Sequence, residues 1–139
     1  PELIDSEGRK RRRAELETLV QIYKDIRAEL ENKVPVIVAG DFNGIARRSD
    51  FEPEFEAVHS QTDWVEVLEV AQASEEDRFS QIQIYTGAKP RKMQIDYIFV
   101  SPELRNRVVA DETGIFFFRN ELGLPLPIPN TLEERGRLP

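Results

Sequence analysis

The sequence predicts a mixed α/β fold. Three observations carry this prediction: an amphipathic helical pattern over residues 8–32, an apolar run over residues 35–40, and a second strand pattern over residues 93–100. Helical and strand periods therefore alternate along the 139 residues, as expected when helices and a sheet share one core. This length fits one domain or a large piece of one.

Residues 8–32 have the period of a helix with one buried face. The apolar residues recur at steps of three and four: Leu16, Leu19, Val20, Tyr23, Ile26 and Leu30. Five consecutive basic residues, 9–13, open this segment. Because the dipole of a helix favours acidic residues at its start, we expect part of the basic run to belong to the preceding loop.

Residues 35–40 predict a short buried strand. Val36, Ile37, Val38 and Ala39 are apolar without polar alternation, which is typical of a strand covered on both faces. Residues 40–44, with the sequence Gly-Asp-Phe-Asn-Gly, then end the strand in turn-forming residues.

The rest of the chain predicts further short elements. In order, we expect a helix at 50–60 with Phe51, Phe55 and Val58 inward, a strand or a helix at 62–71, a strand at 79–86, a turn at 87–90, the strongest strand at 93–100, a helix start at 101–104, strands at 108–109 and 115–118, an extended loop from Asn120, and one helical turn capped by Thr131 and Glu134. The aromatic run 116–118 and Trp64 are interpreted as core residues.

Composition excludes several kinds of site. The chain has no cysteine, so it has no disulfide, thiolate or Cys-based zinc chemistry. With one histidine, His59, metal binding must depend on carboxylate and amide oxygens, which suit Mg²⁺, Mn²⁺ or Ca²⁺. No apolar run is long enough to span a bilayer, no signal-peptide pattern opens the chain, and the compartment is left open.

The first candidate site follows the strand at 35–40. In extended backbone Asp41 and Asn43 lie on one side and Phe42 on the other, so Phe42 can anchor in the core while the polar pair faces a cleft. The carboxylate can orient water or a metal ion, and the amide can hold a phosphoryl oxygen. An ordinary strand-ending turn is the alternative, since Asp, Asn and Gly are common turn residues.

The second candidate is Asp96, in the strand Gln-Ile-Asp-Tyr-Ile-Phe-Val-Ser at residues 94–101. Its strand face is shared with Ile98 and Val100. A carboxylate among apolar side chains is costly to bury without a partner, so we expect Asp96 to have one. The partner is either a catalytic imidazole, held in one tautomer, or a structural group such as an arginine or backbone amides.

These two segments, in this order, resemble the endonuclease/exonuclease/phosphatase superfamily, the DNase I-like proteins. Gly-Asp-Phe-Asn follows an apolar strand, and the Asp96 strand comes some fifty residues later. An amphipathic helix precedes the first motif, and Arg78-Phe79-Ser80-Gln81 lies where family members have a strand with Thr or Ser. The resemblance covers most of the chain.

The resemblance implies a four-layer α/β/β/α sandwich, of which residues 1–139 are a single partial domain without the N-terminal half and the final Ser-Asp-His motif. It also implies divalent-metal-dependent phosphoester hydrolysis. Asp41 would activate or position the attacking water, Asn43 would hold the scissile phosphate, and Asp96 would orient a histidine absent from this segment. Asp41 and Asn43 would contact Mg²⁺ or Mn²⁺. We expect this segment alone to bind Mg²⁺ weakly and to be inactive.

The substrate implied is a phosphoester, with nucleic acid, inositol phosphates and lipid headgroups as candidates. The net charge of −7 disfavours a uniformly DNA-coating surface, but two basic clusters, residues 9–13 and 89–92, allow local phosphate contact. Clusters of this kind are more often solvated surface. The alternative function is a non-catalytic binding or scaffold module that keeps the fold. Oligomeric state is left open.

Overall fold

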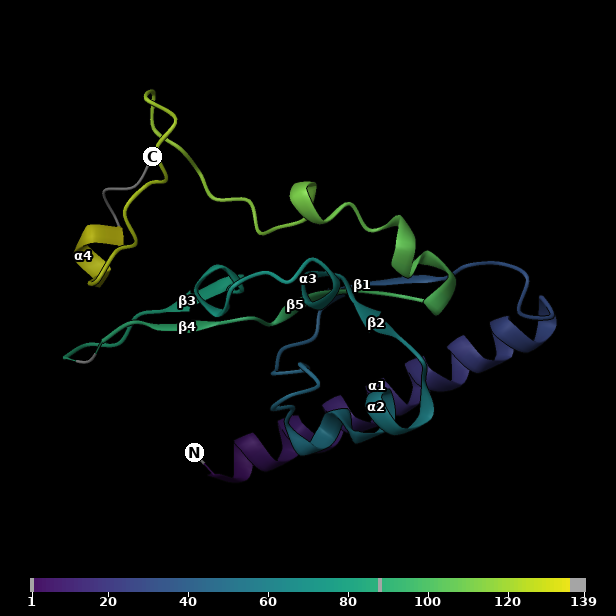
Figure 1. Ribbon diagram of the computed structural model, residues 1–139. Helices are drawn as coiled ribbons and strands as arrows, with labels where there is room; N and C mark the ends of the chain where they lie inside the picture. The colour runs from purple at the N-terminus through teal and green to yellow at the C-terminus, as the bar shows by residue number, and fades with distance from the viewer. Residues whose placement is uncertain (1, 88, 136–139) are drawn as a thin grey trace.

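The computed structural model describes residues 2–87 and 89–135 (Figure 1). The elements, in chain order, are α1 (Glu2–Glu29), β1 (Ile37–Asp41), the 3-10 helix η1 (Pro53–Phe55), α2 (Glu56–Gln61), β2 (Val65–Glu66), α3 (Val67–Val70), the 3-10 helix η2 (Glu75–Asp77), β3 (Gln81–Gln83), β4 (Arg91–Met93), β5 (Asp96–Val100), the 3-10 helices η3 (Pro102–Arg107) and η4 (Ala110–Glu112), and α4 (Leu132–Arg135). The predicted mixture of helices and strands is confirmed. None of the helices described is long and apolar enough to cross a membrane.

Three strands form the central sheet in the order β1-β5-β2, with both outer strands antiparallel to β5. The β1–β5 register pairs Ile37 with Val100 at one end and Asp41 with Asp96 at the other. Strands β3 and β4 form a separate two-stranded hairpin, which Figure 1 shows extending away from the end of β5 at which Asp96 lies.

One face of the central sheet packs against helices α1 and α2, which lie together on that side in Figure 1. The core between them is aromatic: Phe42, Phe55, Trp64, Tyr97 and Phe99 are all buried, together with Leu16, Val20, Tyr23, Ala46, Ala57 and Val58. This confirms the expectation that Trp64 and Phe55 are core residues. The described residues thus form one helical layer and one sheet layer, and the four-layer sandwich is not seen among them.

Helix α1 begins earlier than predicted, and the basic run 9–13 lies inside it rather than in a loop. Carboxylates offset the charge of two of these residues. Arg11 pairs with Glu15 one turn later at 2.9 Å, and Arg12 pairs across the structure with Glu54 at 2.5 Å. These partners explain how the helix tolerates a basic stretch near its N-terminus.

The prediction that residues 35–40 are buried on both faces is wrong. Strand β1 is an edge strand, and Ile37 is 63% exposed. Apolar β-branched residues are favoured in strands with one covered face as well as in strands with two. The run of valine and isoleucine therefore predicts a strand but does not show that both of its faces are buried.

The predicted strand 93–100 is interrupted. Backbone N–H groups of Ile95 and Asp96 both donate to the Ser80 hydroxyl, at 3.1 and 3.0 Å, so the chain leaves one sheet at Met93 and joins the other at Asp96. The ambiguous stretch 62–71 holds both alternatives, since β2 runs directly into α3. Glu66 caps α3 by accepting from the N–H groups of Leu68 and Glu69.

The strands predicted at 108–109 and 115–118 are not formed; apart from an isolated bridge between Arg119 and Pro125, that part of the described chain consists of short turns and extended loop. The prediction that residues 116–118 belong to the core is also wrong, because Phe116 and Phe118 are 78% and 76% exposed. Only Phe117 packs, with its ring centroid 5.0 Å from that of Phe79. Aromatic runs satisfy strand propensity whether or not a neighbouring strand is present.

A short helix, η3, follows β5, as the sequence predicts. Ser101 precedes η3 as expected of a cap, but its hydroxyl instead accepts the N–H of Val36 at 2.9 Å. Ser101 thereby joins the start of β1 to the end of β5.

The Thr131 cap is confirmed, since its hydroxyl accepts the N–H of Glu134 at 3.1 Å. Gly87 has a φ of +75°, consistent with the predicted turn, and Ala88 and Gly136 lie outside the described residues.

Candidate functional site

The loop after β1 has the alternation that the sequence predicts. Phe42 is buried in the core, whereas Asp41 and Asn43 on either side of it are exposed. The backbone N–H of Asn43 donates to Oδ1 of Asp41 at 2.7 Å, and Asn43 has a φ of +52°. This Asx turn fixes one carboxylate oxygen and leaves Oδ2 of Asp41 and the Asn43 amide at the surface.

Asp96 lies directly opposite Asp41 in the β1–β5 register. Facing residues of an antiparallel pair direct their side chains to the same side of the sheet, with Cβ atoms about 5 Å apart. The prediction that Asp96 is buried with a partner is wrong: its residue is exposed, and no described side chain bonds its carboxylate. Asp96 and Ile98 are exposed on this face, although Val100 at its other end is buried, and this exposure removes the desolvation penalty on which that expectation depended.

Asp41 and Asp96 therefore face each other at one exposed end of the sheet, and Asn43 follows Asp41 by two residues. Like charges opposite each other destabilise a strand pair by roughly 0.2–1 kcal/mol. Fold stability gives no reason for the Asp41–Asp96 pair, and a cation or a proton donor placed between the two would relieve the repulsion. The structure thus places Asp96 opposite Asp41 and bonds the Asn43 backbone to Asp41.

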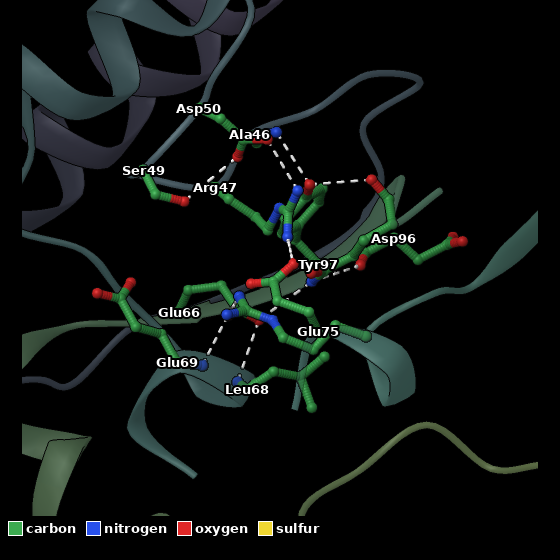
Figure 2. A network of polar contacts seen from close by, with 12 residues as sticks. Ala46, Arg47, Ser49, Asp50, Glu66, Leu68, Glu69, Glu75, Asp96 and Tyr97 are labelled. Carbon is green, nitrogen blue, oxygen red and sulfur yellow. Dashed lines mark hydrogen bonds and ion pairs between the residues drawn. The ribbon is translucent and has the colours of Figure 1, made fainter. Parts of the chain in front are cut away.

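The Tyr97 hydroxyl holds the loop that carries Asn43. It accepts the N–H of Ala46 and donates to the carbonyl of Gln94, both at 2.9 Å (Figure 2). Burial raises the pKa of Tyr97 to about 12, so the hydroxyl keeps its proton. A second link, from the N–H of Phe42 to the carbonyl of Ile95 at 2.7 Å, joins the same two segments.

An ion-paired arginine supports the loop from the helix side. The Arg12 guanidinium donates to Glu52 at 3.1 Å and to the buried Glu54 at 2.5 Å. Gly44 lies against this pair. A Cβ placed there would come within 2.5 Å of Glu52 and 2.8 Å of Arg12, so only glycine fits without displacing them. The Arg12–Glu52 pair thereby limits movement of the backbone next to Asn43.

His59 contributes to the same loop. Its Nε2 lies 3.0 Å from the carbonyl oxygen of Ala46, and its ring packs 4.4 Å from that of Phe51. Burial, reinforced by the charge of Arg48, lowers the pKa of His59 below its usual range and favours the neutral ring. His59 lies in the last turn of α2.

A buried polar network supports the Asp96 side. Glu66 is 4% exposed and accepts from Arg78 at 2.7 Å and from Gln94 at 3.3 Å, besides capping α3. Figure 2 shows the Asp96 carboxylate directed away from this network. Because Gln94 also approaches the carbonyl of Asp96 at 3.5 Å, the network fixes the backbone at the start of β5 and leaves the carboxylate open.

Sequence reasoning missed most of these supporting residues. The sequence indicates Ser80 only as a family-like position, and it predicts no role for the Tyr97 hydroxyl. Arg12 and Glu52 are forty residues apart, and no spacing rule connects them. A signal did exist for Tyr97, because a buried tyrosine hydroxyl almost always has a hydrogen-bond partner.

The donor set fits part of a Mg²⁺ or Mn²⁺ site. Oxygen ligands suit both ions, and Mg²⁺ commonly uses one or two protein carboxylates and completes its shell with water and substrate phosphate. Among the residues described, however, no cluster of three or more carboxylate or imidazole side chains is arranged to hold a metal. Asp41 and Asn43 can therefore contribute to such a site but do not complete it.

Comparison with known proteins agrees with this geometry at the level of the family. Residues 8–113, more than half of the chain, match the model of the Endonuclease/Exonuclease/phosphatase family. The match includes α1 from residue 8 onward, the loop with Asp41 and Asn43, and the whole of β5. No curated protein and no solved structure matches the chain significantly.

Proposed function

The chain belongs to the endonuclease/exonuclease/phosphatase family, and on that premise we propose that it acts in divalent-metal-dependent hydrolysis of a phosphoester. The observation that carries the proposal is the register that places Asp96 opposite Asp41, with Asn43 next to them at the exposed end of the sheet. Family membership supports a hydrolase of the nuclease or phosphatase type. The particular chemistry and the residue roles are our proposal.

In this proposal Asp41 acts on the attacking water. Its Oδ1 is held by the Asn43 N–H, so the carboxylate has a fixed orientation and Oδ2 can accept a proton as water attacks phosphorus. The bond from phosphorus to the leaving oxygen then breaks. A bound Mg²⁺ or Mn²⁺, contacted by Asp41 and Asn43, would supply neutralisation of the charge that develops on the phosphoryl oxygens.

Asn43 holds the scissile phosphate through its side-chain amide. Its left-handed backbone conformation, the Asx turn and the support under Gly44 all limit where that amide can point. Preorganised donors of this kind contribute most when they cannot relax during the reaction. The Asp96 carboxylate, for which no hydrogen bond to a described side chain is seen, would orient an imidazole from outside the described residues.

The four-layer sandwich belongs to the same proposal. Ile37 and Ile98 lie on the open face of the β1–β5 pair, 63% and 46% exposed, where the second sheet of such a sandwich would pack. Residues 1–139 are, in this view, part of one domain whose remaining strands would carry the principal metal carboxylate. The isolated segment would accordingly bind Mg²⁺ weakly and turn over no substrate appreciably.

The test is hydrolysis by the full-length protein that contains this segment. A phosphodiester, a phosphomonoester and an oligonucleotide are assayed with Mg²⁺, with Mn²⁺ and with EDTA. Asp41→Asn keeps the Asx-turn acceptor and removes the charge, and we expect it to lower kcat about 10²–10⁴-fold. Asp25→Asn, on the exposed surface of α1, removes the same charge as a control and should retain activity.

Three results would count against parts of the proposal. Equal turnover by Asp41→Asn and wild type would exclude Asp41 from the chemistry. Robust turnover by residues 1–139 alone would contradict the partial-site interpretation. Failure of the full-length protein on every substrate class, with metal present, would favour the non-catalytic scaffold instead.

A further inference from the structure

A small hollow of about 160 Å³ separates α1 from the β3–β4 hairpin. Residues far apart in the sequence line it: Arg9 and Arg12 from α1, Asn43 from the loop after β1, and Gln81 and Arg91 from the hairpin. The two basic clusters noted in the sequence therefore meet at one place, beside the amide that we assign to the scissile phosphate.

The hairpin register decides which of its basic residues faces the hollow. Gln81 pairs with Met93 and Gln83 with Arg91, so these four share one face, and Ile82 and Lys92 share the other. Lys92 accordingly packs its ammonium 4.4 Å from the centre of the Phe79 ring. Arg91, and not its neighbour Lys92, therefore lines the hollow.

The charges around the hollow are not balanced. Arg12 is neutralised by Glu52 and Glu54, and the Glu52 oxygen that bonds Arg12 also lies 3.4 Å from the N–H of Ile45. Arg91 is exposed, and no described residue forms an ion pair or a side-chain hydrogen bond with it. An anion that entered the hollow would thus meet an arginine with its donors available.

Asn43 connects this hollow to a second one. It also lines a larger hollow, of about 590 Å³, together with Asp41 and Arg11. We propose that the smaller hollow, with Arg91 and Arg9 at its walls, is a subsite for a second, non-reacting phosphate group of the substrate. This inference rests on the proposed function, because it takes Asn43 as the residue that holds the reacting phosphate.

The consequence concerns substrate selection. Arginine binds phosphate oxygens through its planar, multi-donor guanidinium, and such charge-assisted hydrogen bonds are the stronger kind. A substrate with two phosphate groups is therefore preferred over one with a single phosphate. A nucleotide backbone and a polyphosphorylated small molecule both carry this chemistry.

The experiment measures kcat/KM of the full-length protein on matched substrates with and without the extra phosphate. One arm compares the dinucleotide dTpdT with its 5′-phosphorylated form, and the other compares an inositol monophosphate with the bisphosphate. The preferred arm identifies the source of the second phosphate. We expect the extra phosphate to raise kcat/KM about tenfold in at least one arm, roughly the effect of one charged hydrogen bond.

Variants test the assignment to residues. Arg91→Ala should reduce that ratio to near unity, and Arg91→Lys should restore part of it. Arg9→Ala should reduce the ratio as well. The matched control is Arg105→Ala, an exposed arginine of η3 outside the residues that line either hollow. It should keep the wild-type ratio.

The outcomes separate the two proposals. Turnover of all substrates with the same ratio in wild type and Arg91→Ala overturns the subsite and leaves the hydrolase intact. If no substrate is turned over, calorimetric binding of inorganic pyrophosphate decides. Loss of that binding in Arg91→Ala supports the subsite without hydrolysis, and unchanged binding overturns it.

Discussion

The two faces of the β1–β5 strand pair have opposite roles. On one face Tyr97 and Phe99 are 2% exposed and pack against the helices. On the other face Asp41 and Asp96 stand opposite each other at the surface, beside a half-exposed Ile98. A side-chain period of two thus assigns alternate residues of one strand to the core and to the surface that carries the proposed site.

The difference shows how an exposed reactive group gains a fixed position. Asp41 and Asn43 have little burial of their own, but Phe42 between them is anchored in the aromatic core. Tyr97, between Asp96 and Ile98, reaches the loop with its hydroxyl. Buried side chains on the packed face thus fix the positions of the exposed side chains. Substitutions on the packed face should therefore mainly lower stability, and substitutions on the exposed face should mainly lower activity.

Neighbouring residues of β5 give the largest contrast. Phe99→Ala removes a buried ring in contact with Phe42, Trp64 and Tyr97, and should destabilise the fold by about 3–5 kcal/mol. Ile98→Ala, one residue away on the open face, should cost about 1 kcal/mol or less because the side chain is already half in water. Urea unfolding of both variants measures the difference, and equal losses would show that the two faces are packed alike.

Two glycines allow a similar comparison at the loop. Gly44→Ala places a methyl group against Glu52, Arg12 and Phe55, and should cost about 1–3 kcal/mol through overpacking. Gly40→Ala, four residues earlier, meets nothing within 4 Å and should be close to neutral. If both glycines tolerate alanine equally in thermal melts, the loop is not supported by the Arg12–Glu52 pair.

Tyr97→Phe tests the link from the packed face to the loop. Loss of the hydroxyl leaves the buried N–H of Ala46 without a partner and should cost about 1–2 kcal/mol. Hydrogen exchange at Ala46 should accelerate more than exchange in β5. Uniform acceleration through the strand would mean that the hydroxyl stabilises the whole fold and does not specifically position the loop.

The smallest change is a gain. Asp41→Asn removes one of two facing like charges and keeps the acceptor for the Asn43 N–H, so it should stabilise the fold by roughly 0.2–1 kcal/mol. A melting temperature raised by about 1–4 °C, alongside the loss of activity expected above, would show stability given up for chemistry. A lowered melting temperature would indicate that the two carboxylates do not repel each other.

Much of this arrangement could be predicted from the sequence, because local rules determine it. Period-two alternation placed Phe42 inward and Asp41 and Asn43 outward, and helical periodicity placed Leu16, Val20 and Tyr23 in the core. The burial of Asp96 could not be predicted correctly, because it depends on whether another layer covers that face. No property of residues 94–101 contains that information.

Contacts between distant segments were the other limit. The pairing of Arg12 with Glu52 and Glu54, and the two N–H groups received by Ser80, depend on how elements pack in three dimensions. The exposed Phe116 and Phe118 illustrate the same point, since strand propensity does not reveal whether a strand partner exists. The approach of Arg9 to Arg91 likewise appears only in the folded chain.

The most direct test of the account is to map where a divalent cation binds to the full-length protein. With Mn²⁺ as a paramagnetic substitute for Mg²⁺, the amide resonances of Asp41, Asn43 and Asp96 should broaden at the lowest metal concentrations, and Asp41→Asn should weaken that broadening. Resonances of the packed helices, such as Val20, should stay sharp. Broadening that first appears elsewhere, or is unchanged in Asp41→Asn, would contradict the assignment of the open face as the reactive centre.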